Sequence, residues 1–144
     1  AQKAIESVES NSGENNYPRL EVSYVPLGLR LTVQGRILTG TGRNVNVIVK
    51  DRWRIHGMAT ACSYGPAQLL YHTAADLGFV GHPAMLWADQ TTHDIYVQMG
   101  LAKIVARGAK TIAQIADSWN SGNHIDMLVP QLYMDAVEKE YNKL

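Results

Sequence analysis

Hydrophobic residues at the start of the chain repeat with helical spacing. At about 100° per residue, Ala1, Ile5 and Val8 fall on one side of a helical wheel. Glu9 lies at the border of this apolar stripe, whereas Glu6 faces well away from it. The turn-forming stretch NSGENNYP follows directly. The pattern therefore predicts a first helix that ends in this stretch and leaves Glu9 half buried.

Two short runs that alternate between apolar and polar residues come next. They are Leu29, Leu31 and Val33 in the first run and Val45, Val47 and Val49 in the second. The glycine-rich stretch LTGTGRN lies before the second run. Alternation with a period of two is typical of half-buried strands, so we expect a small hairpin or sheet with TGTGRN as its turn.

From Pro66 onward the apolar positions return to helical spacing. Pro66 suits the start of a helix and Gly78 suits its end. The residues that share one face of this helix are Leu69, Leu70, Thr73, Ala74 and Leu77. Three more helices are expected from Thr91 or Thr92 to about Gly108, from Thr111 to about Asn120, and from Pro130 to Tyr141. A helix, a β excursion and a helical remainder predict an α+β domain.

Composition narrows the class of protein. The 144 residues, 46% of them hydrophobic, are enough for one compact domain over residues 1–144. Thirteen basic and thirteen acidic residues balance, so no net charge indicates a nucleic-acid or anionic-membrane partner. We expect no membrane span and no signal peptide, because no apolar run has the length or layout for either. The single cysteine and the spacing of the five histidines also predict no metal site and no cofactor.

The position of Glu9 raises a chemical question. A carboxylate at the edge of a buried stripe is unfavourable unless it is paired or protonated, and a protonated carboxyl group is a potential general acid. The simpler interpretation is that Glu9 reaches solvent or bonds a nearby backbone group. Helix position alone favours this simpler interpretation.

Four stretches that follow one another along the chain favour the general-acid interpretation of Glu9. They are AIESVES, SYGPAQLLYHTAADLGF, IADSWNSGN and VPQLYMDAVEKEY. Together they resemble the successive motifs of the lytic transglycosylases and goose-type lysozymes, which are lysozyme-fold enzymes that cut the glycan strands of peptidoglycan. The resemblance implies a lysozyme-like α+β fold, mainly helical, with a β insertion over residues 22–58. Some relatives carry such an insertion with an Arg-x-Glu segment, which Arg19 to Glu21 resemble.

The resemblance also implies a set of site residues. The family's helix ending in Glu-Ser matches Glu9 and Ser10, and its Glu is the catalytic acid. Its Gly-Leu-Met-Gln segment lines the cleft and matches residues 65–68, of which Gly65 and Gln68 are retained.

Two later motifs complete the implied site. The family's Tyr-Asn-Ala-Gly motif matches residues 119–122, where Trp119 replaces the tyrosine and Asn120 is retained. The tyrosine of its late helix reaches the catalytic carboxyl group and matches Tyr133. If the resemblance holds, Glu9, Gln68, Asn120 and Tyr133 must converge on one cleft.

Several reactions remain open. In the lytic reaction Glu9 serves as both acid and base, and no second carboxylate is needed. A hydrolytic lysozyme would commonly use one, with Glu21 or Asp89 as candidates. A wall amidase would use Cys62, whose thiol could be activated by a helix opened at Pro66, with His72 or His124 as base. A glycan-binding module without activity is a further alternative.

The resemblance predicts the biological context as well. Peptidoglycan glycan strands are the expected partner, and neither nucleic acid nor a membrane span is expected. We further expect an extracytoplasmic monomer that works without a cofactor or metal.

Overall fold

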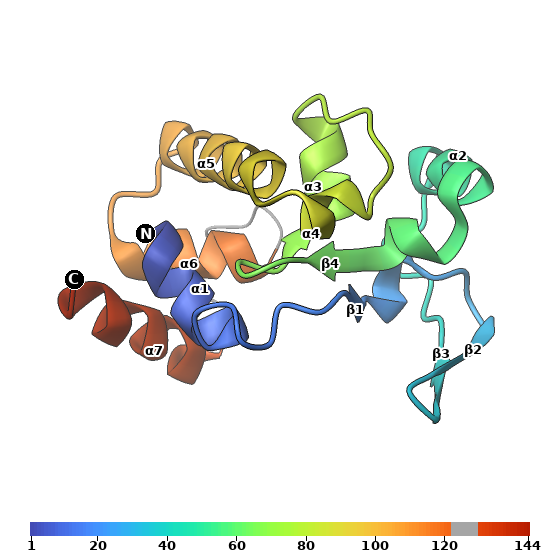
Figure 1. The fold of residues 1–144 in the computed structure, drawn as a ribbon, viewed down its shortest axis with the longest axis horizontal. Helices are drawn as coiled ribbons and strands as arrows, with labels where there is room; N and C mark the ends of the chain where they lie inside the picture. The colour runs from blue at the N-terminus through green and yellow to red at the C-terminus, as the bar shows by residue number, and fades with distance from the viewer. Residues whose placement is uncertain (122–129) are drawn as a thin grey trace.

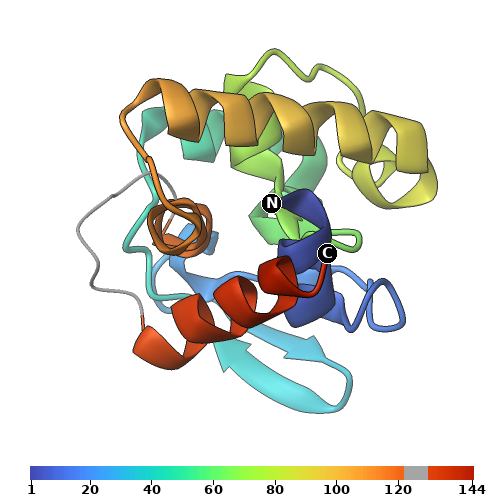
Figure 2. The same ribbon diagram turned by 90° about the vertical axis from the view of Figure 1, so that its left-hand side faces the viewer.

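The computed structural model describes residues 1–121 and 130–144 and has an α+β architecture. Helices from the two ends of the chain lie side by side in its helical part (Figures 1 and 2). The N-terminal helix α1, Gln2–Ser10, packs against the C-terminal helix α7, Gln131–Asn142, and α7 also packs against α6, Ile112–Ser121. The long helix α5, Gln90–Ala106, packs on α6 and crosses over α1.

A small core joins these helices. Its fully buried members include Ile5 on α1, Val97 on α5, and Met134 and Val137 on α7. Short helices α3, Tyr71–Asp76, and α4, Met85–Ala88, cover another side of this core. The apolar periodicity of α1 and α7 therefore places one face of each helix in a common interior.

A three-stranded antiparallel sheet connects the helical part to the rest of the chain. Its strands are β1, Arg19–Leu20, β4, Cys62–Tyr64, and β5, Leu69–Leu70, in the order β1-β4-β5. Leu20 pairs with Cys62, and Tyr64 pairs with Leu69. Because this pair is antiparallel, the segment after β1 lies beside the segment before β4, and the Glu21 N–H donates to the Ala61 carbonyl at 2.7 Å.

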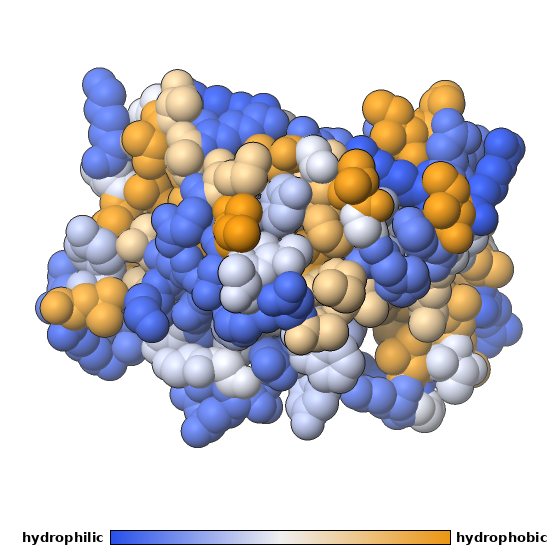
Figure 3. Space-filling view, turned by 45° about the horizontal axis from the view of Figure 1, so that its top comes forward, coloured by the Kyte–Doolittle hydropathy of each residue, from blue (hydrophilic) through white to orange (hydrophobic). Residues whose placement is uncertain are grey.

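Residues 22–58 form a projecting arm at the end of the molecule opposite α7 (Figure 1). The arm contains the 3₁₀ helix η1, Val22–Tyr24, a hairpin of β2, Arg30–Val33, with β3, Arg36–Thr39, and helix α2, Val47–His56. A second 3₁₀ helix, η2, Gly57–Ala61, leads back into β4. In a space-filling view, hydrophobic and hydrophilic atoms are mixed over the end that carries α2 (Figure 3).

The prediction that the two alternating runs form one hairpin was wrong. Gln34 and Gly35, with φ of 51° and 74°, form the hairpin turn, so TGTGRN is not the turn. The second run begins helix α2 instead of a strand, because the Asn46 side chain accepts a hydrogen bond from the Val49 N–H at 2.9 Å and caps the helix. The insertion over residues 22–58 is thus mixed rather than all β.

The helix predicted from Pro66 was also partly wrong. Residues 65–68 form a turn in which Gln68 has a φ of 50°, and Leu69 and Leu70 form β5. The helix begins only at Tyr71 and ends at Asp76, because pairing with β4 satisfies the backbone of the preceding residues.

The three later helices agree with the prediction more closely. Helix α5 begins at Gln90, and the cap is Asp89 rather than a threonine. Thr111 accepts a hydrogen bond from the Gln114 N–H at 3.2 Å at the start of α6, and Pro130 precedes α7. Over residues 1–121 and 130–144, no helix is long and apolar enough to cross a membrane.

Candidate active site

A cleft with a volume of about 310 Å³ lies between the helical part and the arm. Residues of the helical part that line it include Glu9, Lys103, Trp119 and Asn120, and the facing residues are Arg19, Glu21, Ser23, Tyr24, Asn44 and Ser63. Polar and aromatic side chains thus face each other across this groove.

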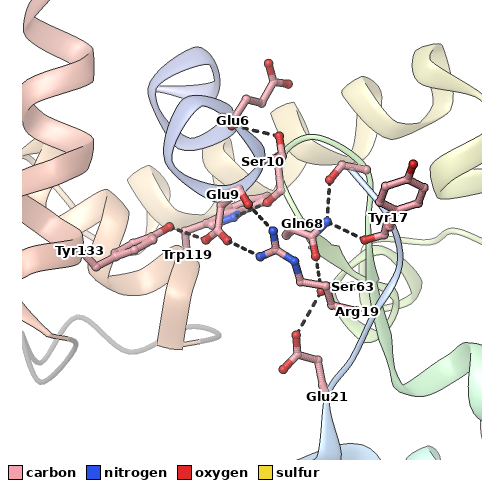
Figure 4. Close-up of polar contacts among 12 residues, drawn as sticks. Glu6, Glu9, Ser10, Tyr17, Arg19, Glu21, Ser63, Gln68, Trp119 and Tyr133 are labelled. Atoms are coloured by element: carbon pink, nitrogen blue, oxygen red, sulfur yellow. Dashed lines mark hydrogen bonds and ion pairs between the residues drawn. The ribbon is translucent and has the colours of Figure 1, made fainter. Parts of the chain in front are cut away.

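Glu9 lies in the last turn of α1 and points into this cleft. Its side chain is only 15% exposed. The Tyr133 hydroxyl donates a hydrogen bond of 2.7 Å to Glu9 Oε1, and Arg19 approaches Oε2 at 3.7 Å from the other side (Figure 4). Burial raises the pKa of Glu9 above its ordinary value of 4.5, while the Tyr133 hydrogen bond and the charge of Arg19 oppose that rise. The pKa is raised overall, which favours the protonated carboxyl group.

Tyr133 is positioned by the packing of α7 on α1. It lies in the first turn of α7, directly before the buried residue Met134. Burial and the neighbouring Glu9 raise the pKa of the Tyr133 hydroxyl, so it remains a hydrogen-bond donor. The side chain of Asn120 also bonds the Tyr133 hydroxyl. The sequence-based prediction that Tyr133 reaches Glu9 is confirmed across 124 positions.

Helix α6 supplies Trp119 and Asn120 to the cleft. The Trp119 indole N–H donates a hydrogen bond of 3.0 Å to the Ala67 carbonyl, which fixes the ring. The ring also lies close to Gly100, where an added Cβ would be 3.2 Å from Trp119 Cζ3. The fourth residue of this motif, Gly122, lies outside the described residues.

Gln68 lines the cleft, but its amide group is already engaged. Its Oε1 accepts from the Ser63 hydroxyl at 2.9 Å, and its Nε2 donates to the carbonyls of Gly65 at 2.9 Å and Tyr17 at 3.2 Å (Figure 4). Gln68 therefore holds the 65–68 turn against the segment that leads into β1. A sugar hydroxyl would have to compete with these bonds.

Ser10 and Gly65 do not belong to the described residues that line the cleft. Ser10 is buried, donates to the Glu6 carbonyl at 3.0 Å and accepts from the Gly13 N–H at 2.9 Å, so it closes the end of α1. Gly65 faces His93, where an added Cβ would be 2.5 Å from the ring. Both residues therefore contribute to the packing around the cleft instead of lining it.

Two residues that the sequence indicated only indirectly also belong to the site: Arg19, as part of the Arg-x-Glu segment, and Glu21, as a candidate second carboxylate. Arg19 donates to the Glu9 carbonyl at 2.5 Å as well as pairing with its carboxylate. Glu21 lines the cleft, and the Ser63 hydroxyl lies 3.1 Å from its Oε1. The Arg-x-Glu spacing is the signal that places both at the cleft, because alternate residues of an extended segment face the same side.

The two candidates for a second carboxylate are in different environments. Glu21 faces the cleft, and its charge contributes to the raised pKa of Glu9. Asp89 caps α5 by accepting from the N–H groups of Thr91 at 3.0 Å and Thr92 at 3.4 Å. Asp89 is thus occupied as a helix cap, and Glu21 is the one of these two candidates that lines the cleft.

Cys62 lacks the surroundings of an activated thiol. It lies in β4 instead of before a helix, and burial raises its pKa to about 11. Burial and Arg52 lower the pKa of His72 to about 4, and the His72 ring stacks on Tyr24 with centroids 4.6 Å apart. The other candidate base, His124, lies outside the described residues.

One cluster of side chains has the spacing of metal ligands. Ligand atoms of Glu6, His93 and Asp94 lie within 4.8 Å of one another. However, Gln2 Nε2 donates to Glu6 at 2.7 Å and to Asp94 at 3.0 Å, and Gln90 donates to Asp94 at 2.7 Å. Amide donors already occupy these carboxylates, so the cluster functions as a hydrogen-bond network between α1 and α5.

Comparisons with known proteins leave the family open. A comparison with protein-family models gives no match, and comparisons with curated proteins and with solved structures give no significant match. The function must therefore be inferred from the motifs in the sequence and from the geometry of the cleft.

Proposed function

We propose that the chain is a peptidoglycan-degrading enzyme that cleaves the glycosidic bond between N-acetylmuramic acid and N-acetylglucosamine. The observation that carries the proposal is Glu9, a buried carboxyl group of raised pKa in a polar cleft, held by the Tyr133 hydroxyl. A general acid needs this environment, because it must keep its proton near the pH at which it works. The order of the motifs in the sequence adds support, and the proposal includes the lysozyme-like fold and the single domain that this order implies.

The proposed reaction is that of a lytic transglycosylase. Glu9 gives its proton to the glycosidic oxygen as the bond from that oxygen to C1 breaks, and the oxygen of the substrate's own N-acetyl group bonds C1. The C6 hydroxyl oxygen then attacks C1, the acetyl oxygen leaves, and the Glu9 carboxylate takes the C6 hydroxyl proton. The product is a 1,6-anhydro ring, and Glu9 is protonated again.

The chain's own residues support both halves of this cycle. Burial favours the protonated Glu9 that the first half requires. The Tyr133 hydrogen bond and Arg19 stabilise the carboxylate that exists between the two proton transfers. Trp119 offers a partly exposed aromatic ring beside this acid, and Asn120 offers a polar side chain for orienting a sugar.

Hydrolysis by a lysozyme is the second candidate, and Glu21 is the observation that favours it. Glu21 faces the same cleft as Glu9 and would activate a water molecule as a second carboxylate. In either reaction the partner is a peptidoglycan glycan strand, so we propose an extracytoplasmic site of action and a monomer.

The primary test is Glu9→Gln with purified cell walls as substrate. The amide preserves the shape but has no proton to donate, so wall cleavage should fall by at least about a hundredfold while the circular dichroism spectrum is retained. Glu6→Gln is the matched control on the same helix and should retain activity. A folded Glu9→Gln protein that still cleaves walls would exclude Glu9 as the acid. If the wild type binds walls without cleaving them, the domain is a binding module instead.

Mass spectrometry of the released fragments separates the two reactions. The lytic reaction yields anhydro ends, and Glu21→Gln should then keep activity within about tenfold of wild type. Hydrolysis yields reducing ends, and Glu21→Gln should then lower activity by at least about a hundredfold. Cut peptide stems would support an amidase and contradict both.

A further inference from the structure

The arm over residues 22–58 has a strongly biased charge. It contains six basic residues and one acidic residue, Asp51, for a net charge of +5, and the remainder of the chain therefore has a net charge of −5. Within the described residues, Arg52 pairs with Asp76 at 2.8 Å and Arg54 with Asp51 at 3.7 Å. The basic residues of the arm without a described carboxylate partner are Arg30, Arg36, Arg43 and Lys50.

Helix α2 of this arm exposes aliphatic side chains to solvent. Val47 is 74% exposed, Ile48 57% and Ile55 72%. At about 100° per residue, these three side chains fall within roughly a quarter of the helix circumference. The opposite side of α2 contains the buried Val49, which faces the arm itself. Helices normally turn their aliphatic residues inward, so α2 has an outer apolar stripe without a partner in the described structure.

Cations border this apolar stripe. Lys50 and Arg54 lie beside it on the helix, and Asp51, the one carboxylate within it, is the partner of Arg54. The two cations also line a second groove of about 230 Å³. Its other lining residues are largely apolar, namely Tyr24, Pro26, Val45, Val49 and Trp53. An apolar groove with cations in its wall suits a molecule that has both an acyl chain and an anionic head.

We propose that the outer surface of α2, made of Val47, Ile48, Lys50, Arg54 and Ile55, binds an anionic lipid bilayer surface. The aliphatic side chains would enter the boundary between headgroups and acyl chains, and the cations would meet lipid phosphates. A purely polyanionic polymer would account for the cations but not for three exposed aliphatic residues. Because α2 and α7 lie at opposite ends of the molecule, binding at α2 leaves α1 and α7 free of the bilayer (Figure 1).

This inference goes beyond the proposed glycosidase function and does not depend on it. Cosedimentation of the whole chain with vesicles measures it directly, comparing phosphatidylcholine alone with phosphatidylcholine that contains phosphatidylglycerol. We expect binding only to the anionic vesicles and a decrease as salt is added. Equal binding to both vesicle types, or to neither, would overturn the proposal. Competition by soluble polyphosphate in the absence of vesicle binding would overturn it in favour of an anionic polymer.

Variants separate the apolar from the charged contribution. Lys50→Glu should weaken vesicle binding by at least about fivefold, since each interfacial cation contributes about that factor. Ile48→Ser combined with Ile55→Ser should weaken it by about tenfold or more. Asp51→Asn should strengthen it several-fold, an outcome that a merely structural role would not produce.

Matched controls come from the other end of the molecule. Val105→Ser, on the exposed side of α5, and Lys110→Glu, just after that helix, make the same kinds of change away from α2. Both should bind anionic vesicles like the wild type. Equal losses in the control and α2 variants would refute a defined surface. Vesicle binding requires no catalysis, so an absence of vesicle binding would not contradict the glycosidase proposal. A Glu9→Gln protein that still cleaves walls would likewise not contradict the lipid-binding proposal.

Discussion

Replacing Tyr133 by phenylalanine isolates the effect of one hydrogen bond on the candidate acid. The ring and its packing on α1 are kept, while the hydroxyl that donates 2.7 Å to Glu9 Oε1 is removed. This bond lowers the pKa of Glu9 against the larger opposing effect of burial. Its loss must therefore raise the pKa of Glu9 further. The remaining stabilisation of the carboxylate comes from Arg19, at 3.7 Å.

The size of the shift follows from the energy of such a bond. A hydrogen bond to a charged group contributes about 1.5–3 kcal/mol, and about 1.4 kcal/mol corresponds to one pKa unit. Because the protonated carboxyl group also accepts some of this bond, we expect a rise of about one unit in Tyr133→Phe. A general acid works only while protonated, so the alkaline limb of kcat/KM against pH should move upward by the same amount.

Two measurements check this expectation. The pH dependence of wall cleavage gives the alkaline limb, and NMR titration of the Glu9 side-chain carboxyl carbon gives its pKa without any assay of activity. Tyr141→Phe, on the exposed last turn of the same helix, is the control and should leave both unchanged. A Glu9 pKa that stays constant or falls in Tyr133→Phe would refute the assigned role of the hydroxyl. A shifted pKa with an unshifted activity profile would show that Glu9 is not the acid.

Two further predictions address the surroundings of the site. Gly65→Ala should lower the free energy of unfolding by at least about 2 kcal/mol in urea titrations, because φ is 73° and the new Cβ would meet the His93 ring at 2.5 Å. Gly108→Ala, at a φ of 114° with open space, should cost less, and equal losses would contradict the steric argument. Cys62→Ser should retain most wall cleavage, and iodoacetamide should react slowly at neutral pH because the thiol pKa is about 11. An inactive serine variant together with rapid inactivation by the alkylator would restore the amidase alternative.

The sequence predicted the helices that have both a clear apolar period and a boundary residue. The stripe of α1 and the Pro130 start of α7 were visible, and packing of these two helices brings Glu9 to Tyr133. Thr111 was likewise a sufficient signal for α6. Local pattern and tertiary structure agree in these segments, so propensity alone was informative.

Short apolar runs were the main source of error. The run Val45 to Val49 fits both a strand and the start of a helix, and the Asn46 cap decided for the helix. The stretch around Leu69 fits a helix face equally well, yet pairing with β4, which ends directly before Gly65, makes it a strand. The periodicity of apolar residues indicates neither a helix cap made by one side chain nor the pairing of two buried strands.

The roles of individual polar groups were less predictable than their location. Gln68 was expected at the cleft and is there, but its amide bonds three neighbours that come from different segments. Arg19 was known only as part of a motif, and its double contact with Glu9 depends on the path of residues 11–18. Such roles are set by tertiary contacts, which a single sequence does not contain.

Arg19 links the two parts of the candidate site. Glu9 is held by helix packing, whereas the Glu21 N–H donates to the Ala61 carbonyl at 2.7 Å next to the β1–β4 pair, so the two carboxylates belong to separately held elements. Arg19 is the first residue of β1 and its side chain pairs with the Glu9 carboxylate, so it contacts both sides. The positive charge of Arg19 lowers the pKa of Glu9, whereas burial raises it. The pKa is raised overall, so burial is the stronger effect. The site thus combines a carboxyl group of raised pKa with a nearby cation that can stabilise its carboxylate form, and the proposed single-glutamate reaction would use both.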